Sequence, residues 1–381
     1  MDDALVLRNA QIVLRDRVIG CGWIAVEDGR IAEIGEGETS VTGVDLRGDM
    51  LVPGLVELHT DHLEPHVMPR PKVAWHPLSA VLAYDAQIAA SGITTVFDSL
   101  RLGADDRKAV IGSASIDLGR VIAGAQKEGL LRSDHLTHLR CEICSPDVVG
   151  ELRTYLAALP VHLVSLMDHT PGQRQFRDIE KLAIYYRGKG GMSEDELQVF
   201  MARRIEMFER YSEPNRRALV GIAREHGVRL ASHDDTLLEH VEESIEAGVS
   251  LAEFPTTMEA AAASHAAGIA VMMGAPNVVR GGSHSGNVSA EELARAGTLD
   301  ILSSDYVPAS LIQAAFELPQ RVPSISLPDA IATVTATPAW SVGLDDRGSI
   351  SPGLRADLVQ VHLAGSTPVV RQVWREGCRV A

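Results

Sequence analysis

Cysteine is scarce in this chain, and its distribution gives no sign of a disulfide framework. The four cysteines are Cys21, Cys141, Cys144 and Cys378. Small disulfide-stapled domains carry many more cysteines at close spacing. Cys141 and Cys144 form a CxxC pair, which fits either a zinc or redox pair or a buried strand end. No second CxxC completes a four-cysteine zinc site.

Long hydrophobic segments are also missing. No run reaches the roughly 18 apolar residues that a membrane-spanning helix needs. The chain starts with Met1-Asp2-Asp3, which lacks the basic residues and apolar run of a signal peptide. We therefore expect no membrane partner and a cytoplasmic location.

Basic residues are outnumbered by acidic ones. The chain has 35 Lys and Arg against 51 Asp and Glu, a formal net charge of −16. Such a surface argues against binding to nucleic acid or to anionic membranes. The 381 residues, 45% of them hydrophobic, suffice for a large barrel with an accessory module. Composition leaves open whether the chain forms a homo-oligomer.

Both ends of the chain have the pattern of short β-strands. Asp28-Gly29 is a hairpin signal between two alternating segments near the N-terminus. The segments from Ser351 to Val361 and from Val369 to Gly377 have a similar character. Because neither end is expected to be stable alone, we predict that residues 1–52 and 345–381 form one small β-sandwich.

The middle of the chain, residues 53–344, alternates strand and helix patterns, which favours βαβ units and a parallel sheet. Eight segments have strand character, the number that a closed (β/α)8 barrel requires. The predicted fold class is therefore α/β, a TIM barrel with the small β-sandwich attached. The strands are expected to start near Leu55, Ile93, Leu136, His162, Val228, Val249, Ile269 and Asp300.

Imidazole and carboxylate side chains lie at the ends of five of these strands. Catalytic residues of parallel barrels gather at this edge, and these donors hold zinc-class ions. The predicted metal ligands are His59, Asp61, Glu142, His169, His233 and Asp305. His59 and Asp61 face the same way because strand side chains alternate. Glu142 is a candidate bridge between two ions, and Asp305 is also a candidate general base.

Structural interpretations compete with several of these assignments. Asp305 is equally suited to capping the following helix, and Asp168 to orienting the His169 imidazole. His62, Glu64 and His66 follow the first strand and are expected to face substrate or solvent. Structural roles are expected for His135, His138, His162, His226, His240, His265 and His362.

Basic residues recur in the loops expected at the barrel mouth, including a long polar loop from Thr170 to Ser193. In an acidic protein, such a rim favours a polyanionic substrate, and the arginine fork matches phosphate oxygens. Gly281 and Gly282 allow backbone N–H groups to approach an anion, although an ordinary Gly/Ser loop has the same composition. The substrate-binding candidates are Arg70, Lys72, Gln173, Arg174, Arg280, Ser283, His284 and Asn287.

Longer motifs carry a resemblance to known families. Val52-Pro53-Gly54 and the tail from Gly348 to Asp357 resemble the amidohydrolase superfamily. The strings Glu57-Leu-His-Thr-Asp61, Pro69-Arg-Pro71, Asp168-His-Thr-Pro-Gly-Gln-Arg-Gln175 and Met273-Gly-Ala-Pro-Asn-Val-Val-Arg-Gly-Gly-Ser-His-Ser-Gly-Asn287 are similar to the PhnM family of the bacterial carbon–phosphorus lyase pathway. Its members are α-D-ribose 1-methylphosphonate 5-triphosphate diphosphatases.

The resemblance implies a phosphorylated ribose substrate and a divalent metal cofactor, expected to be two Zn2+ ions. The sequence departs from the superfamily at three points. His59-Thr60-Asp61 stands where HxH is common, and Glu142 stands where the bridge is often a carboxylated lysine. His169 and His233 end strands four and five, where many relatives use five and six.

The expected reaction is attack of a metal-activated hydroxide on the α-phosphorus, with pyrophosphate leaving. Asp305 takes the water proton, and His284 is a candidate acid for the leaving oxygen. Hydrolysis of a C–N bond in a cyclic amide or N-acyl compound uses the same parts, although a basic rim argues against an uncharged substrate. A noncatalytic scaffold is the third hypothesis, which the retained metal ligands oppose.

Overall fold

The structure is a computed structural model that describes residues 5–70, 73–103, 115–176, 193–283 and 286–381. The chain forms two compact units, and each is described by itself. Unit 1 comprises Met1–Asp98, Val121–Leu136 and Met273–Ala381, and unit 2 comprises Ser99–Arg120 and Thr137–Met272. Lys72, His284 and most of the predicted loop from Thr170 to Ser193 lie outside the described residues.

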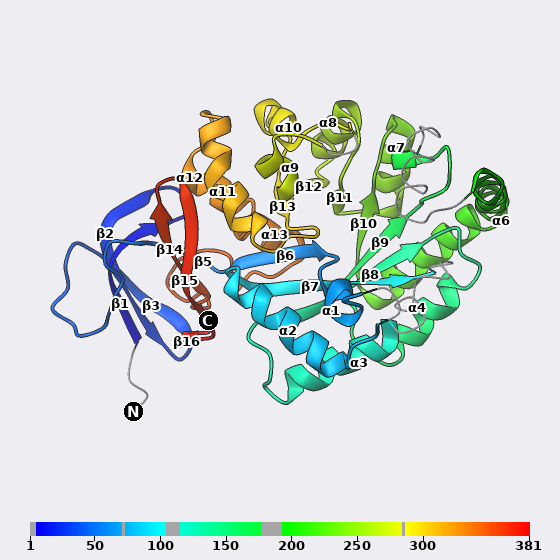
Figure 1. Cartoon of the computed structure of the whole chain (residues 1–381). Helices are drawn as coiled ribbons and strands as arrows, with labels where there is room; N and C mark the ends of the chain where they lie inside the picture. The colour runs from blue at the N-terminus through cyan, green and yellow to red at the C-terminus, as the bar shows by residue number, and fades with distance from the viewer. Residues whose placement is uncertain (1–4, 71–72, 104–114, 177–192, 284–285) are drawn as a thin grey trace. The chain divides into compact units, whose positions relative to one another are not determined.

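Strands from both ends of the chain share one sheet in unit 1, with blue and red strands side by side in Figure 1. The order is β16-β15-β14-β5-β1-β2-β3, and β4 pairs with β1. Leu358 of β14 pairs with Pro53 of β5 in an antiparallel register, so the predicted pairing of the two ends is confirmed. The strands are β1 Leu5–Val13, β2 Val18–Glu27, β3 Arg30–Glu36, β4 Val44–Asp45, β5 Met50–Pro53, β14 Leu358–Ala364, β15 Thr367–Arg375 and β16 Cys378–Arg379.

Alternating apolar side chains give this sheet its core. Leu7, Ile12 and Ile24 are fully buried in a cluster that also contains Trp374. Each such side chain contributes about 1.5–3 kcal/mol through burial. The predicted Asp-Gly turn joins β2 and β3, with positive φ at Asp28 (49°) and at the following glycine (75°), as a type I′ hairpin requires.

A cluster of ion pairs at Asp134 also ties the C-terminal segment of unit 1 to an earlier element. Asp134 opens β8 and accepts from three arginines. Its Oδ2 lies 2.8 Å from Arg347 Nη1 and 2.7 Å from Arg355 Nη1, and its Oδ1 lies 3.3 Å from Arg375 Nη1. One carboxylate therefore holds three cationic side chains from the last part of the chain.

The second sheet contains the eight predicted strands, in the order β13-β12-β11-β10-β9-β8-β7-β6. The neighbouring strands are parallel, as in the pairing of Leu55 with Ile93. Thr60 and Asp305 form a parallel bridge between the first and last strand ends, as barrel closure requires. The strands are β6 Leu55–Thr60, β7 Ile93–Leu102, β8 Asp134–Glu142, β9 Leu163–Met167, β10 Arg229–His233, β11 Leu251–Glu253, β12 Ala270–Gly274 and β13 Ile301–Ser303.

Helices alternate with these strands, which confirms the mixed α/β fold. The longest described helix, α6, begins after a Ser193–Glu196 capping box and ends at Gly227 in the left-handed region. Among the described residues, no helix has both the length and the apolar character needed to cross a bilayer. The helices are α1 Leu63–Val67, α2 Pro77–Ala90, α3 Ser115–Lys127, α4 Val148–Leu156, the 3-10 turn η1 Arg174–Phe176, α6 Glu194–His226, α7 Leu238–Ala247, α8 Met258–Ala266, α9 Ala275–Arg280, α10 Ala290–Ala296, α11 Ser310–Arg321, α12 Leu327–Ala332 and α13 Ala336–Ser341.

Candidate active site

Three predicted ligands come together in unit 1. His59, Asp61 and Asp305 each offer a ligand atom, and these atoms lie within 4.8 Å of one another. The Asp61 backbone N–H donates to the Asp305 carbonyl at 2.9 Å, which joins the ends of β6 and β13. Asp305 has a φ of 55°, a left-handed conformation that is uncommon outside glycine and often functional. An imidazole and two carboxylates suit a divalent ion.

The buried side chain of Glu57 holds the backbone on either side of this group. Glu57 accepts the backbone N–H of His59 at 2.7 Å and that of Ser304 at 2.6 Å. Burial raises the pKa of Glu57, while hydrogen bonds from Ser304 and His59 oppose the rise. Glu57 therefore fixes the two strand ends that carry His59 and Asp305.

Two predicted ligands come together in unit 2. The rings of His169 and His233 lie 5.7 Å apart between centroids. Together with Asp234 they offer three ligand atoms within 4.8 Å of one another. His169 follows β9 and His233 ends β10, so the predicted positions on the fourth and fifth strands are confirmed. Asp234 has a φ of 58°, which turns the chain sharply after the strand.

Glu142, the sixth predicted ligand, lies beside His169. Its Oε2 is 2.7 Å from His169 Nδ1, and its Oε1 accepts from Arg204 Nη2 at 2.9 Å. Burial alone would raise the pKa of Glu142, but the imidazole of His169 and the guanidinium of Arg204 lower it to about 2. Glu142 is therefore a carboxylate anion held by two cationic or polar partners.

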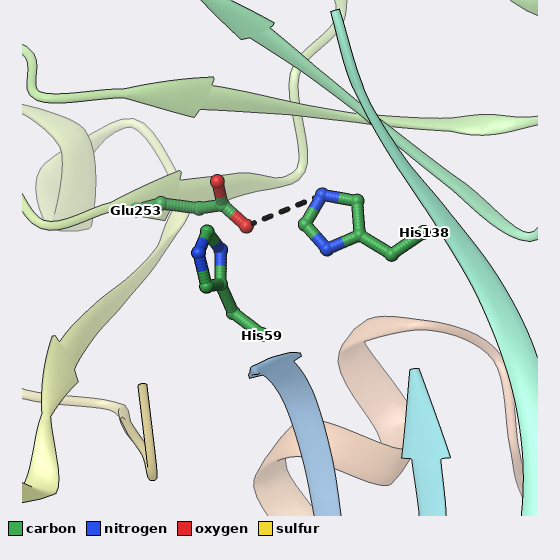
Figure 2. A group of neighbouring side chains, drawn as sticks. All are labelled: His59, His138 and Glu253. Carbon is green, nitrogen blue, oxygen red and sulfur yellow. Dashed lines mark ion pairs between the residues drawn. The ribbon is translucent and has the colours of Figure 1, made fainter. Parts of the chain in front are cut away.

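A second buried glutamate, Glu253 at the end of β11, makes a similar arrangement with His233. Its Oε2 lies 3.0 Å from His233 Nδ1 and accepts from Ser165 Oγ at 2.7 Å. Figure 2 shows its ion pair with His138 of β8, at 3.6 Å from Oε1 to Nε2. His138 Nε2 also contacts the Ser165 hydroxyl. Side chains from three neighbouring strands thus contact one carboxylate.

The structural alternatives can be compared with these contacts. Helix α11 has Ala309 as its N-cap, so Asp305 does not cap it. The carboxylate that lies 2.7 Å from His169 Nδ1 is that of Glu142. Asp168 instead accepts from the Thr170 backbone N–H at 2.9 Å and from the Cys144 thiol at 3.3 Å. Cys144 and Cys141 are both buried free thiols whose burial raises their pKa.

Arg174, a predicted substrate ligand, is buried within unit 2. Its Nη1 contacts Asp235 and donates to the His233 carbonyl at 3.1 Å, and its Nη2 lies 3.7 Å from Glu243. Burial would lower the pKa of Arg174, but Asp235 and neighbouring carboxylates raise it. These contacts tie the η1 turn to the strand end that carries His233.

Several predicted phosphate ligands lie on the surface of unit 1. Arg70 and Arg280 are exposed, and Ser283 and Asn287 are half-buried; Gln173, in unit 2, is half-buried too. The segment from Gly281 begins with two glycines at positive φ, 78° and 148°. The Asn277 carbonyl accepts the N–H of Gly282 at 2.9 Å, and Asn277 Oδ1 accepts that of Ala290 at 3.0 Å. Asn277 thereby holds both ends of this glycine-rich segment.

Sequence reasoning missed Arg204 and Glu253 and assigned His138 only a structural role. Glu253 ends a barrel strand, as Glu142 does, so the same signal could have predicted it as a site residue. Arg204 lies inside α6, 62 residues from its partner Glu142, and no local motif marks it.

Comparison with known proteins identifies relatives over nearly the whole chain. A sequence model described as "Amidohydrolase family" matches residues 63–381. The chain is 44% identical over 381 residues to alpha-D-ribose 1-methylphosphonate 5-triphosphate diphosphatase of Escherichia coli (strain K12), covering 99% of this chain and 100% of that protein. It is 25% identical to imidazolonepropionase of Deinococcus deserti, covering 93% and 91%.

Solved structures show the same fold at low identity. N-acetyl-D-glucosamine-6-phosphate deacetylase from Mycobacterium smegmatis superposes with a TM-score of 0.65 at 16% identity, covering 99% of this chain and 100% of that chain. For 5-methylcytosine deaminase from Klebsiella pneumoniae the TM-score is 0.66 at 15% identity, covering 99% and 98%. At such identities the likeness carries the fold alone.

Proposed function

Since the chain belongs to the amidohydrolase family and is a hydrolase of that superfamily, we propose that it hydrolyses α-D-ribose 1-methylphosphonate 5-triphosphate. One water is consumed, and the products are the corresponding 5-phosphate and pyrophosphate. The observation that carries this proposal is the 44% identity to the diphosphatase over the full length of both chains.

We propose that divalent ions, expected to be two Zn2+, bind at the strand ends. The donor set fits, because the groups in unit 1 and in unit 2 offer imidazole nitrogens and carboxylate oxygens. Bound ions would lower the pKa of a water and add positive charge near the phosphates. The proposed ligands are His59, Asp61, Glu142, His169, His233 and Asp305.

The remaining roles belong to side chains of the chain itself. Asp305 accepts the proton of the attacking water, since its carboxylate lies in the group with His59 and Asp61. Arg70, Arg280 and the N–H groups of the glycine-rich segment bind phosphate oxygens. Lys72 as a phosphate ligand and His284 as an acid for the leaving oxygen stay predictions from the sequence.

The test is phosphorus NMR of the triphosphate substrate incubated with purified enzyme, which should show release of pyrophosphate. Asp305→Asn keeps an oxygen donor but removes the base, and should lower kcat by about 10²–10⁴-fold. Asp345→Asn is the matched control, because Asp345 is exposed, and should turn over normally. Near-normal kcat in Asp305→Asn would eliminate Asp305 as the base.

Arg280, at the end of α9, provides a test of the proposed phosphate binding. Arg280→Ala should raise KM for the triphosphate by about tenfold or more, because a charge-assisted hydrogen bond contributes about 1.5–3 kcal/mol. Exposed Arg217 on α6 is the matched control, and Arg217→Ala should leave KM unchanged. An unchanged KM in Arg280→Ala would show its proposed phosphate role to be wrong.

Hydrolysis of a C–N bond remains the competing function. Its support is the 25% identity to an imidazolonepropionase, well below the identity to the diphosphatase. Production of ammonia or a carboxylate from an N-acyl substrate, without pyrophosphate release from the triphosphate, would favour it. We also propose a cytoplasmic location, supported by four free cysteines, as is usual in a reducing compartment.

A further inference from the structure

In unit 1, the ends of the first and last barrel strands are joined by a side chain as well as by the backbone. The Asp61 N–H donates to the Asp305 carbonyl at 2.9 Å, and His62 Nδ1 lies 3.2 Å from the carbonyl oxygen of Tyr306. We propose that His62 is a positioning residue, which holds the turn after β13 and thereby fixes the position of the Asp305 carboxylate. This inference rests on the proposed role of Asp305 as the base.

The backbone of Asp305 has an uncommon conformation that neighbouring groups must maintain. Its φ is 55°, in the left-handed region, which is unfavourable for a residue with a Cβ and persists where the surrounding structure enforces it. The Asp305 N–H donates to Ser303 Oγ at 3.2 Å, and its carbonyl accepts the Asp61 N–H at 2.9 Å. These two hydrogen bonds hold the peptide groups on either side of the Asp305 Cα.

His62 holds the next peptide group, between Tyr306 and Val307. The side chains of these two residues are 43% and 41% exposed, so packing holds this part of the turn weakly. The Val307 N–H donates to the Ser304 carbonyl at 3.0 Å, while the Tyr306 carbonyl faces His62 Nδ1. Removal of the imidazole takes away this link to the end of β6, and the turn can then relax from the unfavourable conformation at Asp305.

Aromatic packing keeps the His62 ring in place. A carbonyl oxygen only accepts hydrogen bonds, so Nδ1 carries the proton that it donates to Tyr306. The His62 ring packs edge-to-face on His66, with centroids 5.1 Å apart, and its centroid lies 6.4 Å from that of Tyr84. Tyr84 on α2 is fully buried and also packs against His66, at 6.1 Å. The imidazole therefore has a fixed orientation from which Nδ1 reaches the turn.

The test compares two replacements of similar shape. Leucine and asparagine branch at Cγ as histidine does, but only asparagine has a donor at the δ position, where Nδ1 lies. His62→Leu should lower kcat for pyrophosphate release by about 10–100-fold with KM unchanged, because a misplaced base slows the chemical step without weakening substrate binding. His62→Asn should keep kcat within about threefold of wild type. An equal loss in both variants, or a raised KM with normal kcat, would overturn the inference.

His226→Leu is the matched control, because His226 is exposed at the end of α6, and it should turn over normally. A double variant then shows whether His62 acts through Asp305. In the Asp305→Asn background, His62→Leu should lower kcat by less than about threefold, because the base whose position it controls is already gone. The full loss in that background would show that His62 acts by another route and would overturn the inference.

Hydrogen–deuterium exchange tests the inference without turnover. Mass spectrometry of peptides that contain Asp305 and Val307 should show faster exchange in His62→Leu than in wild type or His62→Asn, because the turn opens more often. Equal exchange in all three proteins would overturn the inference, whatever their activity. A wild type that releases no pyrophosphate would overturn the proposed function alone, and the exchange rates would still decide whether His62 holds the turn. His62→Gln, whose amide lies one carbon beyond the δ position, replaces His62→Leu if the leucine variant does not fold.

Discussion

His135 should make the stability of the protein depend on alkaline pH. This histidine is fully buried in unit 1 between the carboxylates of Asp85 on α2 and Asp98 on β7. Its Nε2 lies 3.2 Å from Asp85 Oδ1, and its Nδ1 lies 3.0 Å from Asp98 Oδ2. Because both ring nitrogens face carboxylates, the favoured form is the doubly protonated cation. Burial alone would lower the pKa of His135, but Asp98 and Asp85 raise it to about 9.

The expected stabilisation by His135 follows from the difference between its pKa in the unfolded and folded states. The rise from 6.5 to about 9 corresponds to about 3 kcal/mol at roughly 1.4 kcal/mol per pH unit. Because the folded-state pKa is the higher one, the stabilisation is fully present below about pH 6.5. It is lost as the pH rises towards about 9, where the folded protein also releases the proton.

The assay is urea unfolding of wild type and His135→Gln at intervals from about pH 6 to about pH 10. Glutamine cannot carry the charge, so the variant should be less stable by about 3–5 kcal/mol at the acidic end. The difference between the two proteins should shrink by about 3 kcal/mol towards the alkaline end. Taking the difference cancels the titration of all other groups that the two proteins share.

A second histidine–aspartate pair provides the control. His362 Nδ1 lies 2.8 Å from Asp49 Oδ1, but 40% of the His362 side chain is exposed. Solvent screens such a pair, so His362→Gln should change stability by less than about 1 kcal/mol. Parallel pH profiles for wild type and His135→Gln would refute the assignment of a buried imidazolium.

Three further outcomes are expected. Asp134→Ala should lower the free energy of unfolding by about 1.5–3 kcal/mol, because it removes a carboxylate that three arginines share, while Arg347 keeps Asp346 and Arg355 keeps Asp357; an unchanged urea midpoint would contradict this. Gly54→Ala should lower the melting temperature, since its Cβ would lie 2.2 Å from Thr94 Oγ1, whereas Gly20→Ala has nothing within 4 Å and should change stability little; equal melting temperatures would count against the predicted clash. Brief alkylation of the native protein, followed by mass spectrometry, should label exposed Cys21 and Cys378 before buried Cys141 and Cys144; early label on either buried thiol would disprove its burial.

The fold was predictable because its signals are local. Alternation of apolar and polar residues, bounded by turn residues, predicts the strands. The hairpin at Asp28 lies where Asp-Gly predicts it. All eight strands of the second sheet appear where the sequence placed them. The order of strands and helices along the chain is then compatible with few topologies. The reason is that parallel strands are joined by long crossover connections, which are almost always right-handed. The boundaries 1–52 with 345–381 and 53–344 stay predictions.

The partners of the ligands were less predictable. A strand end with a carboxylate or imidazole marks a candidate, but it does not show which group that side chain faces. Glu142 has the expected residue type, yet its Arg204 contact depends on how α6 packs. The ion pair of Arg174 with Asp235 likewise depends on the turn after β9, and a basic residue in a polar loop gives no sign that it is buried.

The sheet built from both chain ends has a consequence for synthesis on the ribosome. β5 pairs with β14 through Pro53 and Leu358, so its partner emerges only after almost the whole barrel has been translated. At about 5–20 residues per second the delay is on the order of tens of seconds. During that interval the early strands have an unpaired edge. Such edges promote aggregation of nascent chains, and chaperones protect them.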